Sequence, residues 1–230
     1  MKWKLAAALA TPLLLIGCKD APPEPQPAVT AAAAEAPAAD EVTILALGDS
    51  LFAGYGLAPG QSYPAHLETA LKARGIPARI VNAGVSGDTT ADGLARVDFV
   101  LSAMGRKPAL AIISLGGNDM LRAVPPAETR TSLAAILAKF KAAKVPVVLL
   151  QLLAAPNLGK DYADGFNSIY PQLAKQYGAV LVPFWLAPLQ GHPELVQGDH
   201  IHPTSPGIDA LVAATVEQVA GAVPKRRQSK

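Results

Sequence analysis

The sequence contains a single cysteine, Cys18, among its 230 residues. One thiol cannot form a disulfide within the chain, and it cannot build a metal cage from several cysteines. The four histidines do not form an HExxH pattern or a comparable zinc-binding spacing either. The residues therefore predict no metal and no other cofactor.

Nucleotide-binding motifs are also missing. No GxGxxG follows the first apolar run of the body and no GxxxxGK[ST] occurs, so dinucleotide and P-loop interpretations fail. The net charge of +2 comes from the two ends of the chain, because positive and negative residues balance between residues 42 and 224. A neutral body lacks the basic footprint of a nucleic-acid-binding protein, and we expect no nucleic-acid partner.

The first residues have the layout of a bacterial secretion signal. Lys2 and Lys4 precede an apolar stretch that is too short to span a bilayer comfortably, and small residues then lead to Cys18. The ending "LIGC" resembles the lipobox of bacterial lipoproteins. The resemblance implies that residues 1–17 are a signal peptide and that Cys18 is acylated on its sulfur and its new amino group, which gives firm membrane attachment. An ordinary signal peptide with a chance cysteine is the alternative.

Residues 18–41 are predicted to be the lipidated cysteine and a disordered, Ala/Pro-rich tether, because this stretch has no aromatic residue and little apolar surface to bury. Lys19 follows the cysteine in place of Asp, which by the usual lipoprotein sorting rule favours the outer membrane. The expected location is the periplasmic cell envelope, with a lipid anchor. The basic tail 225–230 is interpreted as a solvated end, with weak attraction to anionic lipid as the alternative.

Residues 42–224 are enough for one domain with a substantial core. Apolar runs that are short and rich in β-branched residues predict buried strands at 42–48, 78–84, 109–116, 146–153 and 179–184. Helical patterns lie between or after them at 62–75, 89–105, 125–144, 161–178 and 205–221. Pro171 is expected to kink or interrupt the helix over 161–178.

The alternation of strands and helices predicts an α/β three-layer sandwich. We expect a flavodoxin-like, five-stranded parallel sheet in the order 2-1-3-4-5, with helices on both faces. Ligands bind such sheets outside the carboxyl ends of the strands. Four sets of small, polar or ionisable residues fall at that edge, and they include Ser50, Gly87, Asn118 and the pair Asp199 and His202.

These residues suit nucleophilic catalysis. A serine hydroxyl needs a base to take its proton, and a carboxylate fixes the tautomer of a histidine that acts as this base. His202 can turn back towards Asp199, whereas His200 points away from Asp199 on an extended segment. Ser50, His202 and Asp199 are therefore predicted as nucleophile, base and carboxylate. The alternatives are a helix cap at Asp49 or Ser50 and a metal-binding or merely polar loop at 199–203.

The negative oxygen of a tetrahedral intermediate needs hydrogen-bond donors. The backbone N–H groups of Ser50 and Gly87 and the side-chain amide of Asn118 are predicted as this oxyanion hole. Two alternative interpretations are that Gly87 is a turn glycine with positive φ and that Asn118 is a helix cap. The donor role is preferred for Asn118 because its amide has no other evident partner. Three acidic neighbours are expected to brace turns and caps: Asp49, Asp88 and Asp119.

Four short blocks resemble, in order and spacing, those of the GDSL/SGNH hydrolase family: GDS at 48–50, GD at 87–88, GGND at 116–119 and DxxH at 199–202. The likeness covers nearly all of the body, and "NAGVSGDTTADGLARV" and "LGGNDMLR" are similar to the thioesterase I, lysophospholipase and arylesterase branch. The resemblance implies the same roles for the five residues predicted above. It also implies a loop at 120–126 beside an acyl pocket.

Two departures from this branch leave the pocket size open. Phe52 stands where the branch often has a small residue, and Leu158 stands where an aromatic residue is common. Phe52 also replaces the second glycine of a GxSxG elbow, which argues against the α/β-hydrolase fold.

The resulting hypothesis is a lipid-anchored serine esterase that forms an acyl-enzyme on Ser50. Small or medium acyl esters, aryl esters among them, are the expected substrates, and acyl thioesters and lysophospholipids are further candidates. A carbohydrate O-deacetylase of the same fold and a non-catalytic ligand-binding lipoprotein are the alternatives.

Overall fold

A computed structural model describes residues 41–225 of the chain. The predicted signal peptide, Cys18, the tether up to residue 40 and the tail from residue 226 lie outside the described residues. None of the helices between residues 41 and 225 is long and apolar enough to cross a membrane.

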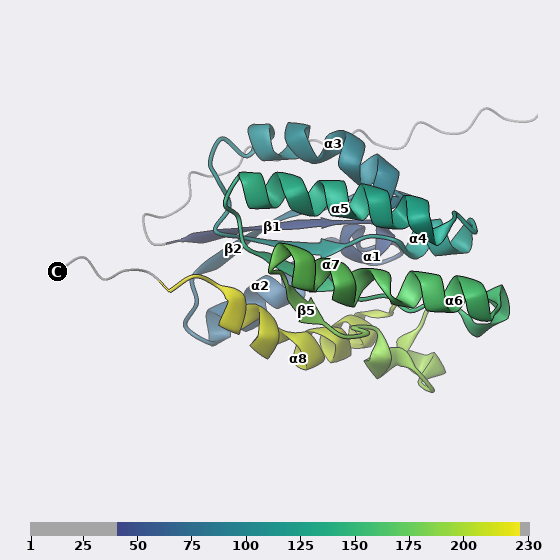
Figure 1. Ribbon diagram of the computed structural model, residues 1–230. Coiled ribbons are helices and arrows are strands. Elements are labelled where there is room, and N and C mark those ends of the chain that lie inside the picture. The colour runs from purple at the N-terminus through teal and green to yellow at the C-terminus, as the bar shows by residue number, and fades with distance from the viewer. Residues whose placement is uncertain (1–40, 226–230) are drawn as a thin grey trace, which may run out of the picture. The chain divides into compact units, whose positions relative to one another are not determined.

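Five parallel strands form one sheet in the order β2-β1-β3-β4-β5, as the sequence predicts (Figure 1). The central strands β1, β3 and β4 are buried at nearly every position, which explains why their sequences are apolar without alternation. The strands are β1 (Val42–Gly48), β2 (Ala78–Gly84), β3 (Leu110–Ser114), β4 (Val147–Leu150) and β5 (Val180–Val182).

Helices cover both faces of the sheet, which confirms the predicted layers. The helices α2 (Tyr63–Ala73) and α8 (Ser205–Ala222) pack together on one face, and α3 (Thr90–Ala103) packs with α5 (Pro126–Ala142) on the other (Figure 1). The remaining α-helices are α1 (Ser50–Ala53), α4 (Gly117–Leu121), α6 (Lys160–Asn167) and α7 (Ile169–Tyr177). Short 3-10 turns are η1 (Pro156–Leu158), η2 (Ala187–Leu189) and η3 (Pro193–Leu195).

Pro171 interrupts the helix predicted over 161–178, as expected. The segment forms α6 and α7, which are separated at Ser168. Proline has no N–H to donate to the carbonyl four residues earlier. That carbonyl, of Asn167, accepts instead from Nε2 of Gln151 at 3.4 Å.

Candidate active site

The carboxyl edge of the sheet carries an open hollow. Ser50, Gly87, Asn118 and His202 all line it. They come from four segments: the start of α1, the loop after β2, α4 after β3, and the loop before α8. The parallel sheet brings these segments together because all of its strands end at one edge.

Ser50 is the first residue of α1, directly after β1. The cap of this short helix is Asp49, whose Oδ1 accepts from the backbone N–H of Leu51 at 3.0 Å. Asp49 is only 2% exposed, and this burial raises its pKa to about 6. The hydrogen bond from Leu51 acts in the opposite direction, because it stabilises the ionised carboxylate. Because Asp49 takes the capping role, the Ser50 hydroxyl remains available for another partner.

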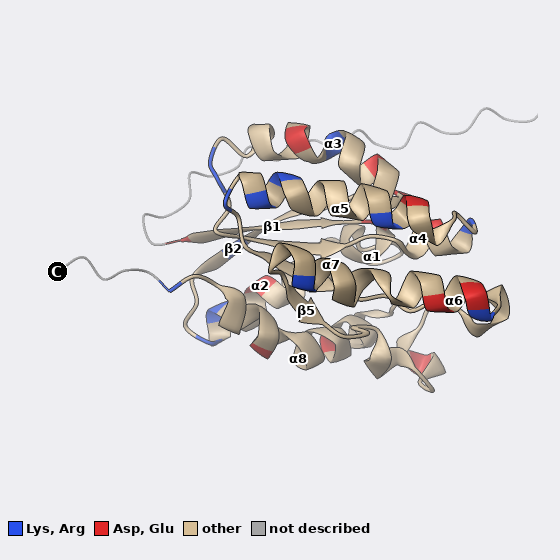
Figure 2. Ribbon diagram, in the orientation of Figure 1, with Lys and Arg blue, Asp and Glu red and all other residues tan. Residues whose placement is uncertain are grey.

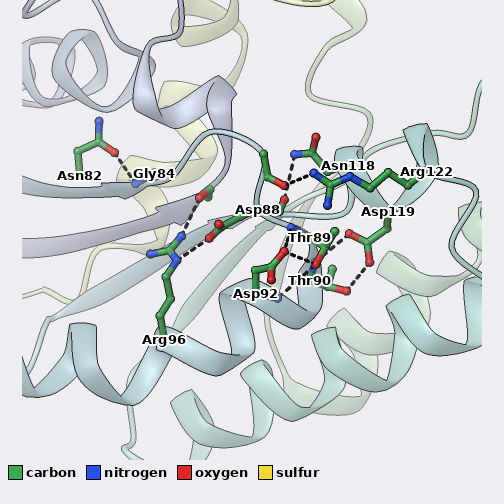
Figure 3. Close-up of polar contacts among 12 residues, drawn as sticks. Asn82, Gly84, Asp88, Thr89, Thr90, Asp92, Arg96, Asn118, Asp119 and Arg122 are labelled. Atoms are coloured by element: carbon green, nitrogen blue, oxygen red, sulfur yellow. Dashed lines mark hydrogen bonds and ion pairs between the residues drawn. The ribbon is translucent and has the colours of Figure 1, made fainter. Parts of the chain in front are cut away.

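The helix α1 is held against β2 by a close backbone approach. A Cβ at Gly84 would lie 2.4 Å from the nitrogen of Ala53, so this position excludes a side chain. Asn82 secures the contact, because its Nδ2 donates to the Phe52 carbonyl at 2.7 Å and its Oδ1 accepts from the Gly84 N–H at 2.9 Å. Figure 3 shows the Asn82 and Gly84 pair. The position of Ser50 is thus fixed by the neighbouring strand.

His202 lies between Ser50 and Asp199. Its Nε2 is 2.8 Å from Oγ of Ser50, and its Nδ1 is 2.6 Å from Oδ2 of Asp199. The other carboxylate oxygen of Asp199 accepts from the backbone N–H groups of Ile201 and His202, both at 3.0 Å. The side-chain bond from His202 and these backbone bonds hold the pKa of Asp199 well below its usual range. His200, at φ +60°, lies in the turn that folds this segment back on itself.

The other histidines lie outside the hollow. Nδ1 of His66 is 2.7 Å from Asp209, and Nδ1 of His192 is 2.9 Å from Glu194. The exposed His200 donates its backbone N–H to the Gln197 carbonyl at 2.9 Å. Within residues 41–225, no group of three or more His, Cys, Asp or Glu is arranged to hold a metal ion.

The loop after β2, which contains Gly87, is bound by side chains in and next to α4. Gly87 has φ +87°, so the predicted turn conformation is confirmed, and its carbonyl accepts from Arg122 Nη2 at 2.9 Å. Nδ2 of Asn118 donates to the carbonyl of Asp88 at 2.9 Å (Figure 3). The expectation that this amide lacks another partner is therefore wrong. An amide carries two N–H groups, so one remains for a ligand in the hollow.

Asn118 is not the cap of α4 either, because the helix begins after Gly116, at φ +117°. A Cβ on Gly116 would lie 2.3 Å from the Tyr170 hydroxyl. The turn at the end of β3 therefore needs glycine for both reasons, and it sets Asn118 one residue inside the helix.

Acidic side chains brace the surrounding loops, as predicted. Asp88 pairs with Nε of Arg96 at 2.6 Å, and Nη2 of Arg96 donates to the Gly48 carbonyl at 2.9 Å. The buried Asp119 accepts from the backbone N–H of Thr90 at 2.8 Å and from the hydroxyls of Thr90 and Thr129. These contacts connect the ends of β1, β2 and β3, and Figure 3 shows those between Asp88 and Arg96 and between Asp119 and Thr90.

Gln197 and Tyr55 are two residues of the site that the sequence reasoning missed. Nε2 of Gln197 donates to the carbonyls of Tyr55 and Pro203, and its backbone N–H donates to the His202 carbonyl at 2.7 Å. The ring of Tyr55 lies 4.4 Å from the His202 ring, centroid to centroid. The sequence offers one weak signal for Tyr55, which is an aromatic residue between two glycines close to Ser50.

Apolar side chains border the hollow although they are exposed. Tyr55, Leu121 and Ile201 line it with 53%, 59% and 47% of their surfaces exposed. Leu121 closes α4, so the expected loop at 120–126 begins as the last turn of that helix.

Phe52 does not line the hollow. Its side chain is 0% exposed and packs on Tyr63 and Trp185, at ring-centroid distances of 5.4 and 6.0 Å. Leu158 lies in η1 and does not line the hollow.

Comparison with known proteins supports this geometry. The model of the GDSL-like Lipase/Acylhydrolase family matches residues 46–210. The chain is 42% identical to Esterase TesA of Pseudomonas aeruginosa over 161 residues, which cover 70% of this chain and 79% of the relative. It is 38% identical to an arylesterase of Vibrio mimicus over 175 residues, which cover 76% and 86% of the two chains. The crystal structure of AlinE4, an SGNH-hydrolase family esterase, matches with a TM-score of 0.69 and 55% identity, over 80% of this chain and 98% of AlinE4.

Proposed function

This chain belongs to the GDSL-like lipase/acylhydrolase family, and from that premise we propose how its residues perform ester hydrolysis. The chain is a serine esterase of the SGNH type that acts on acyl esters. The observation that carries the proposal is the 2.8 Å contact between Nε2 of His202 and Oγ of Ser50, with Asp199 bound to the opposite ring nitrogen.

In the acylation step, Oγ of Ser50 attacks the carbonyl carbon of the ester while its proton passes to Nε2 of His202. Nδ1 carries the other ring proton and donates it to Asp199 in a hydrogen bond, which stabilises the imidazolium that forms. The carbonyl oxygen becomes an oxyanion and accepts from the N–H groups of Ser50 and Gly87 and from the amide of Asn118. When the carbon–oxygen bond to the alcohol breaks, His202 returns the proton to the leaving alkoxide.

Deacylation repeats these steps with water as the nucleophile. His202 takes a proton from the water, the resulting hydroxide attacks the acyl-Ser50 carbonyl, and the same donors hold the second oxyanion. The bond between the acyl group and Oγ then breaks, and the proton on His202 returns to Ser50. The products are a carboxylic acid and an alcohol.

Aryl esters and small to medium acyl esters are the proposed substrates. The hollow is open, and its apolar border of Tyr55, Leu121 and Ile201 suits an aryl group or a short acyl chain. The similarity to an arylesterase supports the same choice. Acyl thioesters and lysophospholipids are further candidates, because the acyl-enzyme chemistry is common to all of them.

The Ser50→Ala variant tests this mechanism. We expect it to lose turnover of p-nitrophenyl butyrate while its circular dichroism spectrum and thermal midpoint stay close to those of the native protein. Undiminished turnover by the folded variant would refute the assignment of Ser50. A matched control is Ser102→Ala, because Ser102 lies at the far end of α3.

Anchoring at the membrane is the second part of the proposal. We infer that residues 1–17 are removed, that Cys18 carries the lipid and that residues 18–41 link it to the body over 42–224. The lipobox-like "LIGC" supports this, and Lys19 after the cysteine favours the outer membrane. Metabolic labelling with a palmitate analogue tests the anchor, and equal labelling of a Cys18→Ser variant would contradict it.

A further inference from the structure

Cations gather at the sheet edge opposite the candidate active site. All strands begin at this edge, so the turn before β3 (residues 104–109) and the turn before β4 (residues 143–146) lie there. Figure 2 shows blue segments clustered at these turns and at the ends of α5 and α8, near the start of β1. We define the basic edge as the exposed cations in and beside the turns before β3 and β4 and after α8, which are Arg106, Lys107, Lys141, Lys144 and Lys225. The exposed Arg74, before β2, is paired with Glu217 and is not counted among them.

Few acidic residues balance this charge. The chain has no Asp or Glu from residue 99 to 118 or from 129 to 160, the two stretches that supply the turns before β3 and β4. Nearby helices do carry ion pairs, such as Lys139 with Asp98. Within residues 41–225, by contrast, no ion pair involves a cation of the basic edge. Glu41, just before β1, is an acidic residue close to the edge.

Apolar surface lies beneath these cations. Two hollows share Val145: one is lined by Arg106 and Lys107, and the other by Lys141 and Lys144. Leu101 and Pro108 contribute to the first and Tyr177 to the second, with Nζ of Lys141 5.7 Å from the Tyr177 ring centroid. Long cationic side chains over apolar and aromatic surface are typical of protein faces that contact a lipid interface.

We propose that the basic edge rests on anionic phospholipid, and that the candidate active site therefore faces the aqueous phase. Charge complementarity supports a lipid surface, because cations near anionic headgroups each strengthen binding. The ends of the described chain support it as well. Val42 opens β1 at this edge and Lys225 follows α8 beside it, so the proposed anchor and the further cations at 226–230 join the body here.

The lipid anchor cannot orient the body by itself. The 23 residues from Lys19 to Glu41 reach up to about 80 Å when fully extended, which exceeds the size of the domain. The basic edge supplies the missing orientation. β1 has seven residues and spans about 23 Å, so Ser50, just beyond its far end, lies about that distance from the basic edge.

This orientation narrows the substrate class of the proposed esterase. A site about 23 Å above the headgroups receives esters dissolved in water and does not reach acyl chains that remain in the bilayer. This step rests on the proposed function, because it takes the hollow around Ser50 to be the reacting site. The opposite arrangement would place the apolar border of Tyr55, Leu121 and Ile201 in the lipid.

Vesicle binding tests the proposal with the chain from residue 18 onward carrying Cys18→Ser, so that no acyl group contributes. We expect sedimentation with vesicles of about two-thirds phosphatidylcholine and one-third phosphatidylglycerol, little binding to pure phosphatidylcholine, and release by high salt. The Arg106→Glu/Lys107→Glu variant should bind at least about thirtyfold more weakly, at about 1 kcal/mol for each cation lost. The matched control Arg130→Glu/Lys160→Glu makes the same change in net charge away from the basic edge.

Two results would overturn the proposal. One is equal loss of binding in the two double variants, which would indicate that the net charge of the protein alone determines vesicle binding. The other is full binding by the Arg106→Glu/Lys107→Glu variant that disappears when residues 226–230 are removed, which would assign binding to the tail. Turnover of p-nitrophenyl butyrate in solution should be unchanged in both double variants, so the proposed function and the membrane surface are tested separately.

An environment-sensitive dye tests the orientation directly. With Cys18 replaced by serine, a cysteine introduced at Ala142, on the exposed end of α5, or at Leu121, on the border of the hollow, is the only one in the chain. We expect the fluorescence of a nitrobenzoxadiazole label to shift to the blue on vesicle binding at position 142 and to stay unchanged at position 121. The reverse pattern would show that the active-site border contacts the bilayer.

Discussion

The side-chain amide of Gln197 donates to the main-chain carbonyl of Tyr55 at 2.8 Å and to that of Pro203 at 2.9 Å. Tyr55 follows the helix that begins at Ser50, and Pro203 follows His202. The two N–H groups of one planar amide therefore join the segment of the nucleophile to the segment of the base. We therefore expect this connection to help hold Ser50 and His202 at their 2.8 Å contact.

Gln197→Ala should lower kcat by about tenfold to a hundredfold with little change in KM, because a small displacement of reacting groups has a large effect on rate. Steady-state kinetics on p-nitrophenyl butyrate provide the measurement. Gln190→Ala is a control, since Gln190 is exposed in the preceding loop. A proportional loss of folded protein, with kcat per folded molecule unchanged, would show that Gln197 serves stability alone.

Asp199→Asn should lower kcat by about 10⁴-fold. The oxygen of the new amide still accepts from the backbone of Ile201 and His202, so its NH₂ group faces Nδ1. The ring proton then moves to Nε2, which can no longer accept from Ser50. Asp209→Asn removes a carboxylate from a similar histidine pair, with His66, and should leave kcat unchanged. Equal activity in the two variants would contradict the role of Asp199.

Asn118→Ala should lower kcat by about 10²–10³-fold, the usual effect of removing one oxyanion donor, while KM changes little. Asn157→Ala, at an exposed asparagine in η1, is the control. A rise in KM at constant kcat would assign Asn118 to ground-state binding, against the proposal.

Asp49→Asn should change how stability depends on pH. The pKa of Asp49 is raised by burial from 3.8 to about 6, so its proton stabilises the folded state below the unfolded pKa. That contribution disappears as the pH rises through about 6, and over this range it amounts to at most about 3 kcal/mol. Urea unfolding at about pH 4 and at about pH 7.5 should therefore show the variant gaining stability relative to the native protein as the pH rises.

The control for this series is Asp161→Asn, at an exposed position in the first turn of α6. If the stability difference between Asp49→Asn and the native protein were the same at both pH values, the buried carboxyl would not titrate as stated.

The strand positions follow from the sequence because burial on both faces leaves uninterrupted apolar runs. The strand order was predicted by analogy with flavodoxin-like folds, and the main helices from their helical spacing. Burial on both faces also makes the ends of the strands difficult to locate from the sequence. Leu115 and Leu152 are 0% and 3% exposed, yet they lie beyond the paired residues of β3 and β4. These two residues are apolar because they are buried, although they do not pair with a neighbouring strand. The predicted strands are therefore longer than the observed ones.

Short elements and main-chain contacts were harder to predict. The helices α1 and α4 have four and five residues, too few to show a helical period. Gln197 acts through carbonyl groups, which every residue possesses, so no pattern of residue types marks its partners. The place of Phe52 close to Ser50 in the sequence does not reveal its burial, because the side chain packs on Tyr63 and on the distant Trp185.

Covalent labelling with a fluorophosphonate, followed by mass spectrometry of the digested chain, tests the assignment of Ser50 most directly. We expect one phosphonate group per native molecule, located on Ser50, and much slower labelling when His202 is replaced by alanine. Native protein that hydrolyses p-nitrophenyl butyrate at full rate while Ser50 stays unmodified after prolonged exposure to the reagent would contradict this assignment.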